Sequence, residues 1–129
     1  MKRKIVSLKK NYEFLRVYKK GSFFVGKFLI LHVHPNRVGE KRIGVSISKK
    51  VGNSVKRNRI KRVIKENFRE YYNTVDENKD YVFVARVGCS DATFTDIKRE
   101  MKFLLKKLSV YVSERENDKK NSDISDKTI

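Results

Sequence analysis

Residues 46–64 of the chain read SISKKVGNSVKRNRIKRVI, and this pattern predicts a strand end, a polar turn and the start of a helix. Five of the seven residues from 56 to 62 are lysine or arginine. At about 100° per residue the apolar positions fall on one side of the helix. They are Ile60, Val63, Ile64, Phe68 and Tyr71. That side must pack against a sheet, so the helix is expected to continue to about residue 72 with its cations facing outward.

The cationic side of this helix is poorly balanced by acids. Only Glu66 interrupts the cations before Glu70, so few ion pairs at i,i+4 spacing relieve their repulsion. Cations also occupy the first turn, where the helix dipole disfavours each of them by ~0.3–1 kcal/mol. A bound phosphate would offset that cost, which favours phosphate binding over an ordinary solvated face. The residues assigned to this surface are Lys49, Lys50, Asn53, Lys56, Arg57, Asn58, Arg59, Lys61, Arg62 and Lys65.

Two arginines fall on the flanks of the helix, between its apolar and its cationic sides. They are Arg57 and Arg59, and they cannot both point straight outward. At least one is expected to lie along the packed surface, near the turn at residues 49–53. Either Asn53 or Ser54 is expected to cap the helix. We therefore expect the junction of strand end, turn and helix start to be the corner that binds phosphate groups.

Composition supports a polyanionic partner. The 129 residues include 32 Lys and Arg against 15 acids, which gives a formal net charge of +17. Nucleic acid is the first candidate partner. An anionic membrane surface is the second, but neither an amphipathic terminal helix nor a lipidation signal supports it. The basic start has no apolar segment after it, so no signal peptide is expected, and no run approaches the ~18 apolar residues of a membrane span.

The remaining pattern predicts a single RNA-binding domain over residues 1–113 and a disordered tail over 114–129. Residues 1–10 are expected to be mobile. Asn11 is the expected cap of a helix over 12–20 that ends at Gly21. Thr93 and Asp96 resemble a capping box before a second amphipathic helix. Strands are expected at 28–33, 42–48 and 80–86, the last covered on both faces.

Aromatic side chains of the first helix have two possible roles. Phe14 and Tyr18 are four residues apart, so they share one face. They either anchor the core or remain partly exposed beside the basic surface, where unpaired bases could stack on them. Gly44 interrupts a strand, which suggests that a packed helix or an RNA strand approaches the backbone there.

Few side chains offer catalytic or metal-binding chemistry. His32 and His34 could bind a metal in principle, but no carboxylate or cysteine lies at ligand spacing, so stacking or hydrogen bonding is the preferred role for His32. The single cysteine, Cys89, excludes an internal disulfide and fits a reducing cytosol. It is expected to be a small packed residue, because no histidine lies near it in sequence to activate the thiol.

The segment RNR at residues 57–59, preceded by SKKVGNSV at 48–55, resembles the RNR motif of the protein subunit of bacterial ribonuclease P. The resemblance extends to the first helix with Phe14, to the strand pattern from Arg42 to Lys50, and to residues 80–86. It implies an α+β fold, an α/β sandwich with a mixed four-stranded sheet and about three helices. It also implies a left-handed βαβ crossover and a fold shared with the second domain of a small-subunit ribosomal protein.

The resemblance further implies a division of labour within a ribonucleoprotein endoribonuclease of the cytoplasm. The RNA subunit, with its Mg²⁺ ions, removes the 5′ leader of precursor tRNA, so no catalytic residue and no cofactor is expected in the protein alone. The basic motif docks on the ribonuclease P RNA, and a cleft binds the leader. The expected cleft residues are Phe14, Tyr18, His32, Arg42, Ser46 and Ser48, with His32 at a position where many relatives are expected to have tyrosine. Neither membrane nor DNA is an expected partner.

Two other functions compete with this interpretation. One is a non-catalytic module that binds ribosomal RNA, since the implied fold also occurs in a ribosomal domain. The other is a nuclease that needs no RNA subunit. The motif Ser-Lys-Lys-x-Gly-Asn, which ends three residues before RNR, distinguishes the ribonuclease P subunit from the first alternative. The lack of paired carboxylates, of a Ser/His/Asp set and of a metal cluster in the sequence argues against the second.

Overall fold

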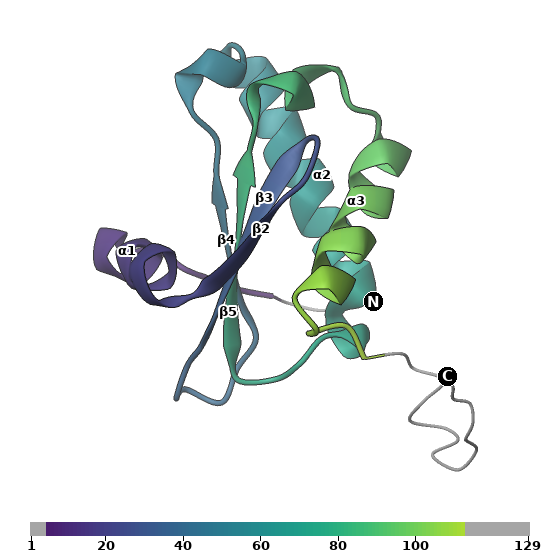
Figure 1. Ribbon diagram of the computed structural model, residues 1–129. Helices are drawn as coiled ribbons and strands as arrows, with labels where there is room; N and C mark the ends of the chain where they lie inside the picture. The colour runs from purple at the N-terminus through teal and green to yellow at the C-terminus, as the bar shows by residue number, and fades with distance from the viewer. Residues whose placement is uncertain (1–4, 113–129) are drawn as a thin grey trace, which may run out of the picture.

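The computed structural model describes residues 5–112, which form a central sheet with helices on both faces (Figure 1). The strands are β1 (Val6–Ser7), β2 (Ser22–Val25), β3 (Leu29–Pro35), β4 (Arg42–Ser46) and β5 (Lys79–Ala85). The helices are α1 (Asn11–Lys20), α2 (Ser54–Tyr71) and α3 (Phe94–Lys107). Three 3₁₀ turns, η1 (Lys49–Val51), η2 (Tyr72–Thr74) and η3 (Val87–Asp91), join them. The predicted tail lies outside the described residues.

The sheet is mixed and has the order β1-β4-β5-β3-β2. Strand β4 is parallel to both β1 and β5, whereas β3 is antiparallel to β5 and to β2. The parallel neighbours β4 and β5 are joined by a crossover through α2, so the RNR segment opens the crossover helix directly after β4. The expected α+β sandwich with three helices is confirmed. The expected number of strands, four, is wrong, because the sheet has five.

Two short strands, β1 and β2, lie outside the three segments that the sequence pattern predicted as strands. Strand β1 has two residues, and it lies in a segment that we expected to be mobile. Val6 pairs with Arg42, and Leu8 is buried, so the basic start of the chain is anchored at the sheet edge from residue 5 onward. Strand β2 has four residues and follows Gly21 at once. Neither segment is long enough to show a clear alternation of apolar and polar residues.

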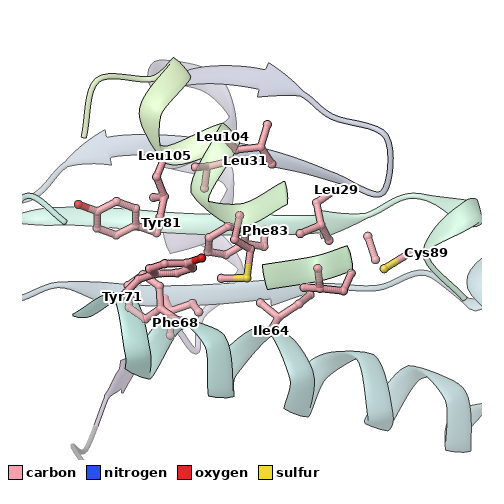
Figure 2. Close-up of a cluster of buried hydrophobic side chains, with 14 of the residues drawn as sticks. Leu29, Leu31, Ile64, Phe68, Tyr71, Tyr81, Phe83, Cys89, Leu104 and Leu105 are labelled. Carbon is pink, nitrogen blue, oxygen red and sulfur yellow. The ribbon is translucent and has the colours of Figure 1, made fainter. Parts of the chain in front are cut away.

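One face of the sheet is covered by α2 and α3 and forms the main core (Figure 2). Phe68 of α2 lies at its centre, with its ring centroid 5.5 Å from that of Tyr81 and 6.2 Å from that of Phe83. The apolar stripe of α3 buries Met101, Leu104 and other residues against the same face. The helical periodicity therefore identified the packing sides of both helices correctly. One exception is Asn67 of α2, a fully buried amide that the pattern did not predict.

Among the described helices, α1 alone lies on the other face of the sheet (Figure 1). Its small cluster consists of Leu8, Val17 and Val82, with Phe14, Tyr18 and Val84 packed partly against it. Strand β5 is thus covered on both faces, as expected. The structure also explains Gly44, because a Cβ at that position would lie 2.7 Å from Cε2 of Phe14. A packed helix, rather than RNA, approaches the backbone there.

The starts of two helices were predicted with different success. Thr93 and Asp96 form the expected capping box of α3. Asn11, in contrast, is not the cap of α1, because it is the first residue within the helix and Lys10 precedes it. The Glu13 carboxylate instead accepts hydrogen bonds from the backbone N–H groups of Lys9 and Lys10, at 2.8 and 2.9 Å. These bonds hold the pKa of Glu13 below its ordinary value.

Two further findings limit what this fold can do. Cys89 is buried in the main core, and burial raises the pKa of its thiol to about 11. It is therefore a packed residue, as expected, rather than a reactive nucleophile. None of the helices within residues 5–112 combines the length and the apolar character that a membrane span requires.

Candidate nucleic-acid interface

A groove of about 370 Å³ runs between α1 and β4 on the sparsely covered face of the sheet. We call it the α1 groove, and its lining residues are Asn11, Phe14, Leu15, Tyr18, Val45, Ser46 and Ile47. Phe14 is wedged over Gly44, yet both Phe14 and Tyr18 remain partly exposed. The two alternatives from the sequence therefore both hold in part, since these rings pack against the fold and also face the groove.

The aromatic surface continues from α1 across the sheet. The Tyr18 and His32 ring centroids are 4.9 Å apart in an edge-on arrangement, and Phe23 stacks on the other side of His32 at 5.4 Å. Phe23 is 58% exposed and was missed by sequence reasoning. Only the pairing of β2 with β3 places it opposite His32, and β2 itself was not predicted. The structure thus brings together the three predicted aromatic residues and adds a fourth.

His32 is suited to stacking rather than to charge pairing. Burial lowers the pKa of its imidazole, so the ring is neutral at pH 7. Its Nδ1 atom is buried and has no hydrogen-bond partner among the described residues. A neutral ring between two aromatic neighbours extends the aromatic surface beside the groove, the kind of surface on which unpaired bases stack.

The other three predicted cleft residues, Arg42, Ser46 and Ser48, lie in three different environments. Arg42 donates from Nε and Nη2 to the two carboxylate oxygens of Asp80, at 2.8 and 3.0 Å, and lies 3.4 Å from Glu13. Its guanidinium is thus tied to two acids, and it braces β4 against β5 and α1. Ser46 lines the α1 groove. Ser48 is exposed next to the turn, where its carbonyl accepts a hydrogen bond from the N–H of Val51.

A second, smaller hollow of about 170 Å³ connects the groove to the basic helix. It is lined by Val45, Ile47, Arg57, Asn58 and Lys61. Val45 and Ile47 also line the α1 groove, so the two hollows adjoin along the end of β4. A strand that occupied the groove would therefore pass directly onto the start of α2.

The start of α2 has the expected geometry. The Asn53 side chain accepts from the N–H of Lys56 at 2.9 Å, which identifies Asn53 as the cap. Arg57 donates to the carbonyl of Gly52 at 3.1 Å, and Arg59 donates to the carbonyl of Ala92 at 3.2 Å. Both flanking arginines therefore lie along the packed surface, one at the turn and one toward α3. The expectation that at least one would do so is confirmed.

The remaining cations of this surface face outward. The exposed residues are Lys49, Lys50, Asn53, Lys56, Asn58, Lys61 and Arg62. Lys65 is partly buried, and its pKa is lowered by that burial and by the nearby charges of Lys61 and Arg69. The first turn of α2 contains no acid, whereas the first turn of α3 contains Asp96. The start of α2 is thus a site where an anion would relieve both the helix dipole and the mutual repulsion of the lysines.

The acidic and metal-ligating side chains of residues 5–112 are dispersed or already engaged. Within that range, no three or more His, Cys, Asp or Glu side chains are arranged to hold a metal ion. The buried acid Asp80 is bound by Arg42 and by the Asn36 side chain. The described surface therefore offers cations and aromatic rings, which bind and position RNA.

Comparison with known proteins agrees with this geometry. A family model described as Ribonuclease P matches residues 1–109. The chain belongs to the ribonuclease P protein family. A relative from Clostridium kluyveri, named Ribonuclease P protein component, is 46% identical over 109 residues, which cover 83% of this chain and 97% of that protein. A relative of the same name from Clostridioides difficile is 41% identical over 106 residues, which cover 81% and 93% of the two chains.

Solved structures of the ribonuclease P protein family have the same fold. The RNase P protein of Staphylococcus aureus superimposes with a TM-score of 0.76 at 35% identity, covering 84% of this chain and 99% of that one. The RNase P protein of Thermotoga maritima gives a TM-score of 0.73 at 23% identity, covering 83% and 99%, and this likeness shows the fold alone. In this chain the RNR segment occupies the start of the crossover helix α2.

Proposed function

We propose that this protein binds a ribonuclease P RNA through the start of α2 and holds the 5′ leader of precursor tRNA in the α1 groove. The observation that carries this proposal is the continuity of the two surfaces. Val45 and Ile47 line both the aromatic groove and the hollow beside Arg57, Asn58 and Lys61. A single protein face can thus contact the leader and the catalytic RNA at the same time.

The chemistry of each surface supports its assigned partner. The exposed cations at η1 and α2 would neutralise closely spaced phosphates of a folded RNA. This electrostatic contribution supplies a large share of the affinity between proteins and nucleic acids. The rings of Phe14, Tyr18, His32 and Phe23 would stack on unpaired bases of the leader. Stacking is tolerant of sequence, which suits a protein that must accept the leaders of many tRNA precursors.

Catalysis is assigned to the RNA subunit and its Mg²⁺ ions. The protein contributes by binding the leader, which the precursor has and the mature product lacks, so that it raises affinity for substrate over product. It also reduces phosphate repulsion where the RNA strands and metal ions crowd together. Such a role is that of a cytoplasmic protein that works beside its RNA partners, as part of a ribonucleoprotein endoribonuclease for tRNA 5′ maturation.

Reconstitution with a ribonuclease P RNA at low Mg²⁺ tests the proposal. Adding the full chain should restore 5′ cleavage of a precursor tRNA, and the protein without RNA should cleave nothing. If adding the protein left the 5′ cleavage of precursor tRNA unchanged, the proposal would be contradicted. Cleavage by the protein alone would instead assign catalysis to the protein.

The leader site is tested by Phe14→Ala. This change should weaken binding of precursor tRNA about 5-fold to 150-fold and leave binding of mature tRNA nearly unchanged, because a base stacked on an aromatic ring contributes ~1–3 kcal/mol. Tyr12→Ala is the matched control, since Tyr12 is an exposed ring on the same helix that does not line the groove. Equal losses for precursor and mature tRNA would contradict a leader contact. A melting curve for each variant separates loss of binding from loss of folding.

A further inference from the structure

A second groove lies on the opposite face of the sheet, between α3 and the turn that joins β2 to β3. Its volume is about 540 Å³, and we call it the α3 groove. The lining residues are Lys27, Phe28, Asp96, Arg99, Glu100 and Phe103. Strand alternation explains why β2 serves both faces. Phe23 pairs with His32 on the α1 side, whereas Phe24 pairs with Leu31, whose side chain belongs to the main core.

Exposed aromatic rings continue this groove along α3. Phe103 is 46% exposed and Phe24 is 36% exposed. Their centroids are 5.8 Å apart at an interplanar angle of 78°. The Lys107 ammonium lies over both rings, 5.7 Å from the centroid of Phe24 and 5.6 Å from that of Phe103. Two accessible rings joined by a cation form a contiguous surface of the kind on which an unpaired base stacks.

The two acids of the α3 groove are already engaged. The Glu100 carboxylate accepts hydrogen bonds from the backbone N–H groups of residues 27, 28 and 29, at 3.0, 2.6 and 2.7 Å. Asp96 accepts from the N–H of Thr93 at 3.0 Å within the capping box. The hydrogen bonds to Glu100 fix the turn against α3. They bring the carboxylate so close to Gly26 that a Cβ there would lie 2.5 Å from the Oε2 atom of Glu100. Both acids keep their charge, so the cations Lys27, Arg99 and Lys107 leave this surface with a net charge of +1 (three cations against two acids), and these cations are the side chains that can meet a phosphate.

The charge of the surface decides between two kinds of occupant. The outer edge of β2 is unpaired, so a second copy of the chain could in principle add a strand there. A second copy would bring a net charge of +17 against the same cations, which opposes that arrangement. An RNA strand offers the complementary charge. Its unpaired bases also supply the flat apolar surfaces that Phe103 and Phe24 would otherwise expose to water.

We infer that the α3 groove binds an unpaired stretch of RNA, with bases against Phe103 and Phe24 and phosphates at Lys27, Arg99 and Lys107. This surface lies on the other face of the sheet from the α1 groove, and it is distinct from the start of α2, no residue of which lines it. It allows the protein to hold two RNA segments at once, one on each side of the sheet.

Fluorescence anisotropy with a labelled oligouridine 12-mer tests the inference on the full chain. Phe103→Ala should weaken binding about 5-fold to 150-fold, the range for loss of one stacked base. Phe94→Ala is the matched control, because Phe94 is 40% exposed on the same helix and does not line the groove. Nine residues at about 100° each also place it on the opposite side of α3 from Phe103. The control should bind as the unmodified protein does.

The oligonucleotide is also expected to enter the α1 groove, so both variants are repeated in a Phe14→Ala background. The loss caused by Phe103→Ala should persist there, since distant independent sites contribute additively. Arg99→Ala gives a second variant if Phe103→Ala lowers the melting temperature. It should reduce the slope of log affinity against log salt by about 0.7, the value for one phosphate contact on a single strand.

Three outcomes would overturn the inference. The first is equal affinity of Phe103→Ala and Phe94→Ala for the oligonucleotide. The second is disappearance of the Phe103→Ala effect in the Phe14→Ala background. The third is a dimer in sedimentation that Phe103→Ala dissociates while RNA binding stays unchanged, which would assign the surface to a second copy. None of these readouts depends on tRNA processing, so failure of the proposed function and failure of this inference are distinguishable.

Discussion

The two faces of the sheet differ in how completely they are covered. The face under α2 and α3 forms a continuous core in which Phe68, Tyr81 and Phe83 are fully buried. The face under α1 has three buried apolar residues and a row of partly exposed rings. Because one face supplies most of the buried apolar surface, the other can leave its aromatic residues accessible. The fold thus places most of its stabilising core on the face under α2 and α3 and leaves accessible rings on the face under α1.

We call the face under α2 and α3 the closed face and the face under α1 the open face. The difference between them predicts that the largest change in stability follows a substitution on the closed face. Phe68→Ala should lower the free energy of unfolding by about 3–5 kcal/mol, because it removes a fully buried ring from the centre of the core. Leu15→Ala, at a 49% exposed position on α1, should change it by less than about 0.5 kcal/mol. Urea titrations of the two variants measure both values. Similar losses of unfolding free energy in the two variants would contradict the view that the closed face supplies most of the stability.

The next largest effect is expected on the open face itself. Gly44→Ala should cost about 1–3 kcal/mol, because the new methyl would lie 2.7 Å from Cε2 of Phe14 and the ring must move. The displaced ring should also weaken binding of the leader. The double variant Gly44→Ala with Phe14→Leu should recover part of the stability but not the binding. If the single and double variants unfold at the same urea concentration, the conflict with Phe14 is not the cause.

Stability and RNA binding can also be compared within a single helix, α2. Its inner side packs on the closed face and its outer side carries the basic surface. Lys56→Glu places an acid in the first turn, where the helix dipole and the Asn53 cap favour it, so the free protein should gain about 0.3–1 kcal/mol. The same change should weaken binding of ribonuclease P RNA.

Lys61→Glu is the matched control for Lys56→Glu, because it alters the net charge equally but lies beyond the first turn of α2. It should weaken RNA binding with a smaller gain in stability. Thermal melts and RNA titrations at several salt concentrations measure both properties. An equal gain in stability for the two variants would attribute the effect to net charge rather than to the helix dipole.

The smallest expected effect is a dependence on pH from the open face. Burial lowers the pKa of His32 in the folded protein, so the unfolded chain takes up its proton first as the pH falls. The free energy of unfolding should therefore decrease as the pH falls below about 6.5 and level off below the folded pKa. His32→Tyr should reduce this decrease. Urea titrations between pH 7.5 and 5 provide the measurement, and an unchanged profile in His32→Tyr would contradict the assignment.

Much of this organisation follows from the sequence itself. Helical periodicity identified Ile60, Ile64 and Phe68 as the buried side of α2, and the Thr93 and Asp96 pair marked the start of α3. Composition and the RNR segment are by themselves enough to indicate an RNA partner. These features are local or additive, since caps, helix faces and net charge depend on residues that are near one another in the chain.

The tertiary structure alone decided which surfaces exist. The pairing of β2 with β3 set Phe23 against His32 and Phe24 toward Phe103. The packing of α1 and α2 on either side of β4 brought the α1 groove next to the hollow at Arg57. The sequence determined that the chain carries a basic helix and that Phe14 and Tyr18 share one face of another helix, and it left the exposure of these rings open. It did not determine that they form two grooves on opposite faces, because the register of a four-residue edge strand depends on contacts between residues far apart in sequence.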